Sequence, residues 1–496
     1  MFDPSRRKLL KAAALLPVAS SFARMATAAE SLAGASAQAT FTLQLDRPGR
    51  LVSDSLTGFS YETLQLANPA FFSVDNHALI QMFRQLSPRG VLRIGGNTSD
   101  YTVWSEYRGE LPTQKVGKIG PQRTFVLHPE SLHALAGFLR ATGWKLVFGV
   151  NLKVGVPVMG VELARAVQQI VGDSLLAIQI GNEANNYEKD YAAFDTAWMP
   201  YAVAIRAAGM PIAGPDTGAN TDWVIDYAKR HGAENVFLSR HYYRDGAPNG
   251  SIPNLLATDT GFFTEVEQIM SVADAAHLPF RLSEANSYYS GGRDGVSNVF
   301  ASALWGADFM LALVQRGVDG INFHGGTVES VEASLGHGVN TATTAADLSA
   351  RRDAVTSRYS AIAGDVELGF QPRPVYYGML LAQQFAGAQM VPGDLSAAGV
   401  NLTAYAALRD GAVQVALINK DATRDASVAI SGLKGFGAGQ LMHLSAPSLD
   451  SRHGIVLEGM DGAAAGHPIS ADAHDTCHVR LPRSSAAWVR LNRAAS

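Results

Sequence analysis

The stretch from Leu56 to Gly326 alternates short apolar, β-branched runs with longer segments of helical periodicity, and no other feature of the chain limits its possible folds so strongly. Each apolar run ends in polar residues or glycine, which is typical of a buried strand that runs into a turn. Eight strand–helix units in succession predict an α/β fold of the (β/α)8 barrel type. The predicted strands are Leu56–Tyr61, Val91–Ile94, Lys145–Val150, Leu175–Ile180, Pro211–Gly214, Val236–Ser239, Pro279–Leu282 and Gly320–Phe323.

Between these runs, segments of ten residues or more repeat apolar side chains at the spacing of an amphipathic helix. A doubly wound sheet would instead place a glycine-rich phosphate loop after its first strand, and Leu56–Leu64 contains no such loop. The predicted helices include His77–Leu86, Pro129–Thr142, Val161–Val171, Ala192–Ala208, Phe262–Ala276 and Phe300–Arg316.

The sequence pattern changes after a helix-like segment at Val375–Ala386. Residues 387–496 show short alternating segments separated by glycine and proline turns, which predicts a β-sandwich domain behind a catalytic barrel at residues 51–386. Within residues 29–50, the alternating Thr40–Leu45 is suited to add a strand to that sandwich. The stretch Thr327–Gln371 has no clear periodicity apart from a helical Ala345–Ser357, so we expect a loop insertion over the barrel mouth.

The first 28 residues have the three regions of a twin-arginine export signal in the right order. A basic segment with Arg6-Arg7 is followed by an apolar stretch, Ala12–Ala23, and by the small-residue site Ala26-Thr27-Ala28. We therefore expect export to the periplasm or the exterior, with a mature chain that begins near Ala29. An attached basic amphipathic helix is the alternative interpretation.

Net charge and cysteine content limit the kinds of partner and cofactor that we expect for this chain. Removal of residues 1–28 takes away five cationic residues and one anionic residue, which moves the formal net charge from −4 to −8 and disfavours nucleic acid. No apolar run of membrane-spanning length follows the N-terminal segment, so no membrane association is expected after signal removal. The chain has a single cysteine, Cys477, and no spacing typical of metal ligands. We therefore expect no disulfide framework, no metal and no other cofactor.

Two glutamates follow predicted strands at positions where a barrel collects its chemistry, the C-terminal strand ends. Glu183 ends the fourth strand within Gly181-Asn182-Glu183, and Glu284 ends the seventh strand 101 residues later. Cleavage of a glycosidic bond needs one carboxylic acid to protonate the leaving oxygen and one carboxylate to stabilise or attack the anomeric carbon. The pair therefore predicts a glycosidase that acts on a carbohydrate substrate, although either glutamate alone is equally compatible with a surface carboxylate.

Neighbouring strand ends carry polar residues that suit this chemistry. His241, Tyr242 and Tyr243 end the sixth strand, and we expect them to hydrogen-bond Glu284 and keep it charged. Asn182 is expected to donate to the sugar hydroxyl beside the anomeric carbon. A satisfied packing histidine is the alternative for His241.

Four motifs together resemble glycoside hydrolase family 79, the family of heparanases and microbial β-glucuronidases. They are Gly181-Asn182-Glu183-Ala184-Asn185, the run Leu92–Asp100, His241-Tyr242-Tyr243, and Glu284 followed by Tyr289-Ser290-Gly291-Gly292. The similarity covers most of residues 56–386. It implies a (β/α)8 barrel with a β-sandwich, hydrolysis with retention of anomeric configuration, and no metal.

The resemblance also implies roles for individual residues. Glu183 would be the acid/base, and Glu284 would be the nucleophile, at a carboxyl separation of about 5–5.5 Å. The backbone amides of Gly291 and Gly292, with Tyr289 nearby, would bind a uronate carboxylate. Further expected contacts are Glu62 and Asn97 to sugar hydroxyls, Tyr243 at the site, and Arg293 as a positive charge beside the glycine pair.

The resulting interpretation is a β-glucuronidase that removes terminal glucuronic acid from glycans or glycoconjugates. A heparanase-like endo-enzyme is less favoured, because Lys115, Lys118, Arg123 and Arg244 are scattered rather than clustered for a sulfated polyanion. A retaining glycosidase of the same clan that acts on neutral sugars stays open. A lectin that kept only the sugar pocket is disfavoured by the presence of both glutamates.

Overall fold

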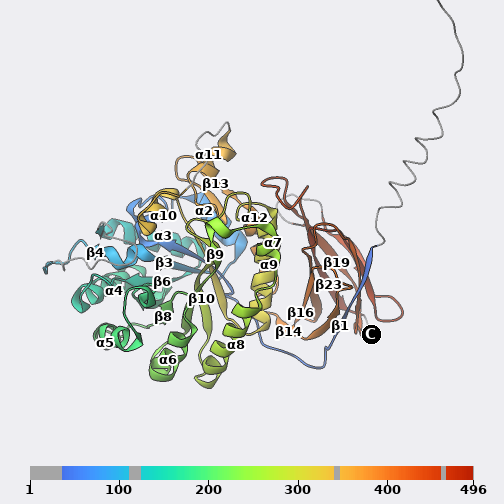
Figure 1. Cartoon of the computed structure of the whole chain (residues 1–496), viewed down its shortest axis with the longest axis horizontal. Helices are drawn as coiled ribbons and strands as arrows, with labels where there is room; N and C mark the ends of the chain where they lie inside the picture. Colours follow the sequence, from blue (N-terminus) through green and yellow to red (C-terminus); the bar gives the residue numbers. More distant parts are fainter. Residues whose placement is uncertain (1–35, 111–123, 340–346, 460–464, 495–496) are drawn as a thin grey trace, which may run out of the picture.

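The computed structural model describes residues 36–110, 124–339, 347–459 and 465–494. The predicted signal segment, together with Lys115, Lys118 and Arg123, lies outside the described residues. Figure 1 shows two units, a barrel ringed by helices and a β-sheet unit that packs beside it.

The barrel consists of eight parallel strands, so the predicted fold class is confirmed. Seven neighbouring pairs form continuous ladders, and the eighth junction, between β7 and β8, is closed by a bridge between Ile178 and Ile212. Backbone bonds from Ile178 N to Pro211 O (2.9 Å) and from Ala213 N to Ile178 O (3.0 Å) complete it. The strands are β2 (Thr57–Glu62), β3 (Val91–Gly95), β6 (Lys145–Val150), β7 (Leu175–Ile180), β8 (Gly214–Thr217), β9 (Leu238–Gly246), β10 (Phe280–Tyr289) and β11 (Gly320–Gly325).

A helix follows every barrel strand and buries an apolar face against the sheet. The helix α9 is apolar on nearly all sides, because it is covered by the barrel on one side and by α12 and the sheet unit on others. The helices are α2 (His77–Leu86), α3 (Pro129–Thr142), α4 (Pro157–Val171), α5 (Tyr191–Ala207), α6 (Thr221–His231), α8 (Thr260–Ala275), α9 (Phe300–Gln315) and α12 (Pro374–Gln383), with the short α7 (Ile252–Leu256) before α8.

Two details of the predicted barrel are wrong. The fifth strand is β8 at Gly214–Thr217 rather than Pro211–Gly214, because the apolar residues before it form only the bridge that closes the barrel. The helix α6 was not predicted, since its five apolar residues are interleaved with four charged ones. It is nevertheless well defined, and the Asn220 side chain accepts from Trp223 N at its start.

The insertion after β11 has more regular structure than its sequence pattern predicts. It contains α10 (Val328–Leu335), α11 (Leu348–Ala354) and a hairpin of β12 (Ile362–Asp365) and β13 (Gly369–Pro372). Short elements of this length carry too few turns to show a clear period. The helix α10 packs on the loops after β2 and β3, so the insertion does cover part of the barrel mouth.

The sheet unit is a sandwich of two sheets around an apolar core. One sheet has the order β15-β1-β18-β22, and the other has the order β14-β16-β17-β23-β19-β20 with β21 also on β19. The N-terminal β1 pairs in parallel with β18, which places a strand from before the barrel inside this unit. The strands are β1 (Ala37–Leu43), β14 (Gln389–Val391), β15 (Gly393–Ser396), β16 (Leu402–Arg409), β17 (Ala412–Asn419), β18 (Ala426–Ser431), β19 (Phe436–Ser445), β20 (Val456–Leu457), β21 (His467–Ser470), β22 (Cys477–Leu481) and β23 (Ser485–Arg493).

Polar contacts fix the sandwich to the barrel at two places. Asp308 of α9 accepts from Thr403 Oγ1 (2.6 Å), Tyr405 OH (2.7 Å) and Lys420 Nζ (2.6 Å), all from the sandwich. Near the start of α9, Arg452 of a sandwich loop donates to both oxygens of Asp294 at 3.1 and 2.9 Å. The second contact ties the sandwich to the loop that follows β10.

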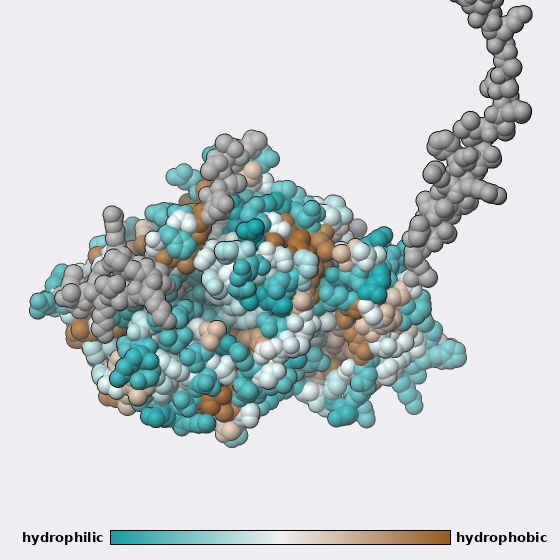
Figure 2. Space-filling view, viewed as in Figure 1, coloured by the Kyte–Doolittle hydropathy of each residue, from teal (hydrophilic) through white to brown (hydrophobic). Residues whose placement is uncertain are grey.

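The outer surface gives little sign of a large apolar face. Figure 2 shows mostly hydrophilic residues on one side of the molecule, with hydrophobic ones in separate small areas. Within the described residues, no helix has both the length and the apolar character needed to span a bilayer.

Candidate active site

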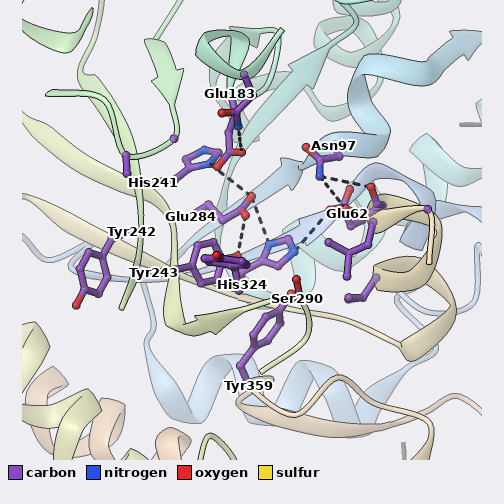
Figure 3. Close-up of a pocket in the computed structure, with 18 of the residues that line it drawn as sticks. Glu62, Asn97, Glu183, His241, Tyr242, Tyr243, Glu284, Ser290, His324 and Tyr359 are labelled. Carbon is purple, nitrogen blue, oxygen red and sulfur yellow. Dashed lines mark hydrogen bonds and ion pairs between the residues drawn. The ribbon is translucent and has the colours of Figure 1, made fainter. Parts of the chain in front are cut away.

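Side chains from the C-terminal strand ends meet in a cavity of about 660 Å³ at the barrel mouth. This volume lies within the range of small-ligand sites. Figure 3 shows Glu183, Glu284 and His241 pointing toward one another, with Glu62 and His324 beyond. The cavity lining consists of Glu62, Asn97, Glu183, Asn186, Gly218, Ala219, His241, Tyr242, Tyr243, Glu284, Tyr289, Ser290, His324, Val331, Ser334, Leu335, Gly336, His337 and Tyr359.

The two predicted glutamates are brought together. One carboxylate oxygen of Glu183, one of Glu284 and a ring nitrogen of His241 all lie within 4.8 Å of one another. Glu183 follows β7, and Glu284 lies in β10, so the barrel strands set their spacing.

The backbone at Glu183 is strained. Its φ is +48°, a left-handed conformation that costs a residue with a side chain about 1 kcal/mol or more. The turn is held because Glu183 N donates to Asp216 O (2.9 Å) and Asn186 N donates to Glu183 O (2.8 Å). The carboxylate then accepts at both oxygens, from His241 Nδ1 (2.9 Å) and from Asn186 Nδ2 (2.8 Å).

Arg93 is the central cation beneath the cavity, and sequence reasoning assigned it no role. It is fully buried and donates to Glu284 Oε2 (2.7 Å), Asp216 Oδ2 (2.6 Å) and Asn182 Oδ1 (2.7 Å). Its position inside the apolar run Leu92-Arg93-Ile94 was the available signal, because a charge in a buried strand requires partners.

Glu284 is held in its ionised form. Burial alone would raise its pKa, but His324, His241 and Arg93 and a hydrogen bond from Tyr243 OH (2.8 Å) lower that pKa to about 2. The carboxylate therefore stays charged across the working range of most enzymes. It is suited to act as a nucleophile.

His241 contacts a different carboxylate from the one expected. Its Nδ1 donates to Glu183 Oε1 at 2.9 Å and lies 4.0 Å from Glu284 Oε2, while its Nε2 donates to Asp216 Oδ1 at 3.0 Å. The predicted hydrogen bond from His241 to Glu284 is therefore wrong, because the bond to Asp216 orients the ring toward Glu183. Burial alone would lower the pKa of His241, but Asp216, Glu284 and Glu183 raise it to about 10, so the ring is a cation.

Asp216 completes this network from the end of β8. Besides Arg93 and His241, its oxygens accept from Gln179 Nε2 (2.7 Å) and Ser283 Oγ (2.5 Å). Burial would raise the pKa of Asp216, but Arg93 and His241 hold it well below the usual range. Two buried cations thus face two buried anions, Asp216 and Glu284.

The side chains of Tyr242 and Tyr243 in β9 point to opposite faces of the sheet, because successive side chains alternate along a strand. Tyr243 faces the cavity and Glu284, as predicted for a site residue. Tyr242 instead donates to Asp259 Oδ2 at 2.9 Å, and Figure 3 shows its ring directed away from the glutamates. The expected bond from Tyr242 to Glu284 is wrong.

Glu62 and His324 form the far side of the cavity floor. Glu62 accepts from Thr98 N (2.9 Å) and Thr98 Oγ1 (2.7 Å), and burial, the largest effect, raises its pKa. Gly96 leaves room for it, because its φ is +69° and a Cβ there would lie 2.3 Å from the Glu62 carboxylate. His324 Nε2 lies 3.7 Å from Glu62 Oε1, and its Nδ1 lies 3.6 Å from Glu284 Oε2.

The two predicted asparagines differ in their access to the cavity. Asn97 lines it and donates to Ser334 Oγ (3.2 Å) on α10. Asn182 lies behind the lining, where its oxygen accepts from Arg93 and its Nδ2 donates to Asn97 Oδ1 (3.0 Å). Its Nδ2 has a second hydrogen besides the one donated to Asn97, so its contact with a sugar hydroxyl stays a prediction.

Asp100 anchors the turn that carries Glu183. It accepts from the backbone amides of Leu152 (2.8 Å), Lys153 (3.1 Å) and Asn182 (3.0 Å). Burial raises the pKa of Asp100 to about 6 against the effect of these amides.

The cavity wall includes the last residue of β10 and the residue that follows it. Tyr289 and Ser290 line the wall, whereas Gly291 and Gly292 lie behind it, which corrects their expected place. Both glycines have positive φ, and a Cβ on Gly292 would lie 2.7 Å from Tyr359 N. Arg293 is also absent from the lining, and its side chain packs against Gly250.

One wall comes from the insertion, which sequence reasoning placed over the mouth without naming a contact residue. Val331, Ser334, Leu335 and Gly336 of α10 and its C-terminus line the cavity, followed by His337. Tyr359, further along the insertion, lies 6.1 Å from Tyr243 between ring centroids. No periodic signal in this stretch could have identified these side chains.

A (β/α)8 barrel that carries two paired carboxylates, one after β7 and one within β10, with the second held ionised, has the fold and the site arrangement of a glycoside hydrolase. No protein-family model matches the chain. Two curated relatives are named β-glucuronidase: one from Neurospora crassa is 25% identical over 283 residues, and one from Aspergillus niger is 24% identical over 311 residues. The resemblance to β-glucuronidases is thereby confirmed.

These matches cover 48% and 53% of this chain and 50% and 55% of the relatives, so the chain spans about half the length of the curated relatives it matches. Among solved structures, a 4-O-α-L-rhamnosyl-β-D-glucuronidase from Fusarium oxysporum superposes with a TM-score of 0.70 at 17% identity, over 91% of this chain and 99% of that one. A GH51 arabinofuranosidase from Xanthomonas axonopodis pv. citri gives 0.63 at 16% identity, over 92% and 100%. At such identities the structures establish the fold alone.

Proposed function

We propose that this protein is a retaining β-glucuronidase that hydrolyses terminal β-linked glucuronic acid by double displacement. The observation that carries the proposal is the close carboxylate pair of Glu183 and Glu284, in which Glu284 is kept ionised by Arg93 and Tyr243. The named relatives support the substrate class.

The chemistry divides between the two glutamates. In the first step the carboxylate of Glu284 attacks the anomeric carbon while the carboxyl of Glu183 gives its proton to the leaving oxygen, so the glycosidic bond breaks and an ester to Glu284 forms. In the second step Glu183 takes a proton from water, which attacks the anomeric carbon and releases Glu284. The spacing within 4.8 Å suits this direct attack better than attack by an intervening water.

A uronate carboxylate needs hydrogen-bond donors, which the carboxyl groups of Glu62 and Glu183 supply poorly, so we place it against the opposite wall. That wall carries the hydroxyl groups of Ser290 and Tyr359 and the exposed ring of Tyr289, while the proton of Tyr243 OH is already donated to Glu284. We propose that the carboxylate lies there, next to the segment Tyr289–Gly292, and that sugar hydroxyls face Glu62 and Asn97. Neutral donors of this kind bind an anion without a compensating arginine.

A second candidate is a retaining glycosidase that acts on a neutral sugar. The observation that favours it is the cavity lining, which includes neither arginine nor lysine among the described residues. The fold shared with an arabinofuranosidase does not distinguish the two candidates.

The deciding experiment compares hydrolysis of an aryl β-D-glucuronide, the matching β-D-glucoside and an aryl α-L-arabinofuranoside, with Glu284→Ala as control. A preference for the glucuronide of 100-fold or more, abolished in the variant, supports the proposal. Activity confined to a neutral sugar supports the second candidate. A Glu284→Ala variant that keeps more than a few per cent of the wild-type rate refutes the assignment of the nucleophile.

We further propose that the mature enzyme acts outside the cytoplasm, since Arg6-Arg7 and the apolar segment that follows have the order of a twin-arginine signal.

A further inference from the structure

The sandwich brings together two histidines and a glutamate that lie far apart in the sequence. His443 is in β19, Glu458 follows β20, and His467 begins β21. One ligand atom from each lies within 4.8 Å of the other two. Among the described residues, only the glutamates and histidine of the candidate active site form another such group.

The strand pairing sets this convergence. Both β20 and β21 pair with β19 along the same edge, with Leu444 opposite Leu457 and Leu441 opposite His467. His443 lies between these two contacts. Glu458 N donates to His443 O (3.0 Å), and His443 N donates to Glu458 Oε2 (2.9 Å), so the carboxylate is held in place by the backbone.

The contacts from the two histidines to Glu458 are long hydrogen bonds, one to each carboxylate oxygen. His443 Nδ1 lies 3.3 Å from Glu458 Oε2, and His467 Nε2 lies 3.3 Å from Glu458 Oε1. Charge-assisted N–H···O contacts are shorter, about 2.7–2.9 Å. By contrast, ligand atoms about 2.0–2.1 Å from a tetrahedral zinc ion are separated by about 3.3–3.4 Å.

We propose that His443, Glu458 and His467 form a binding site for a divalent transition-metal ion, with zinc as the best-suited member of that class. Two imidazoles and one carboxylate are a known zinc ligand set, in which water takes the fourth position. The His467 side chain is 59% exposed, so this position opens to solvent.

Such an ion would tie two very short strands to the edge of the sheet. The strand β20 has two residues and β21 has four, so each contributes few ladder hydrogen bonds of its own. A metal bound to one residue from each segment adds a link between β19, β20 and β21 that the short ladders alone cannot supply. The role is therefore structural. It is independent of the proposed glycosidase activity.

The test is calorimetric titration of the metal-free full-length protein with zinc chloride, together with its thermal unfolding temperature. We expect one zinc per chain at this site and a raised unfolding temperature. Affinity should fall at least tenfold in His467→Ala and in Glu458→Gln. His467 is exposed and Gln is isosteric with Glu, so neither change should prevent folding.

Two control variants separate this site from other zinc-binding positions. His478→Ala removes an exposed histidine that lies 3.7 Å from Asp472 and belongs to no three-ligand group among the described residues, and it should bind zinc as the wild type does. Glu284→Ala should also leave this binding unchanged. The proposal is overturned by the absence of stoichiometric binding, by equal binding in His467→Ala, or by binding that is lost only in Glu284→Ala, which would place the ion in the barrel cavity.

Discussion

His241 holds a positive charge between the two glutamates that we propose to be catalytic, and the change His241→Gln removes that charge while it keeps an amide donor. The ring nitrogen Nδ1 lies 4.0 Å from Glu284 Oε2. At an effective dielectric constant near 20, a unit charge at this distance stabilises the carboxylate by about 4 kcal/mol. This energy corresponds to a rise of about 3 in the pKa of Glu284 on loss of the charge.

This figure is an upper value, because the imidazolium charge is spread over the ring and Arg93 and His324 stay in place. Starting from a pKa of about 2, the variant should therefore titrate Glu284 between about 3 and about 5. Because the nucleophile must be ionised, the acid limb of the pH profile should move upward by at least one pH unit. Activity at neutral pH should fall less than activity at pH 4.

The assay is kcat/KM for an aryl β-D-glucuronide from pH 3 to pH 8, since this parameter reports groups of the free enzyme and free substrate. The carboxyl of the substrate titrates equally with both enzymes and so does not affect the comparison. His231→Gln is the matched control, because it removes another buried histidine from a carboxylate, Asp195, at 2.6 Å and far from the cavity. An unmoved acid limb in His241→Gln, with circular dichroism showing a folded variant at pH 4, would refute the electrostatic role.

Further predictions concern the same network, the acid/base, the domain junction and the N-terminus. The pKa of His241 is raised from 6.5 to about 10, so its contribution to stability is complete below pH 6.5 and is lost as the pH rises through about 10. The difference in unfolding temperature between wild type and His241→Gln should accordingly narrow from pH 7 to pH 10, and a constant difference would contradict the raised pKa. Glu183→Ala should slow substrates with poor leaving groups at least 100-fold more than activated aryl glycosides, and azide should restore the latter; equal losses on both would argue against an acid. Arg452→Gln should raise KM up to about fivefold with kcat unchanged, because the partly exposed ion pair with Asp294 contributes about 1 kcal/mol at most to holding the loop after β10. The control is Arg424→Gln, which breaks an ion pair within the sandwich and should leave KM unchanged. Replacement of Arg6 and Arg7 by lysine should retain the protein in the cytoplasm, as fractionation of the producing cells would show; normal export would exclude the twin-arginine route.

The sequence predicted most of the barrel strands because these strands are buried on both faces and appear as continuous apolar runs, whereas β8 (Gly214–Thr217) has no such run and was misplaced. The residues Glu183 and Glu284 were found for the same reason, since strand ends in a barrel converge whatever the loops do. The partners of Arg93 and Asp216 show what was not predictable. Both act through partners on other strands, and no local spacing records a contact such as Arg93 to Glu284, which are 191 residues apart.

The insertion shows a different limit. Its helix α10 supplies a cavity wall through Val331 and Leu335, yet its two turns leave almost no periodic trace in the sequence. The identity of Val331 and Leu335 as cavity residues depends on packing against the loop at Asn97 rather than on any motif. Specificity is therefore harder to predict than mechanism, because the catalytic pair comes from the barrel and much of the cavity wall comes from the insertion.

The buried charges of this site indicate that the fold gives up some stability in favour of function. Arg93, Asp216 and His241 lie almost wholly away from solvent, where ion pairs are often no more stabilising than well-packed apolar residues. Glu183 adds a backbone conformation that is unfavourable for a residue with a side chain. A network built for stability would avoid both features. Their presence together at the ends of β3, β7, β8 and β9 is explained if the network serves to hold one carboxylate ionised beside a second that must exchange a proton, which is the requirement of double displacement.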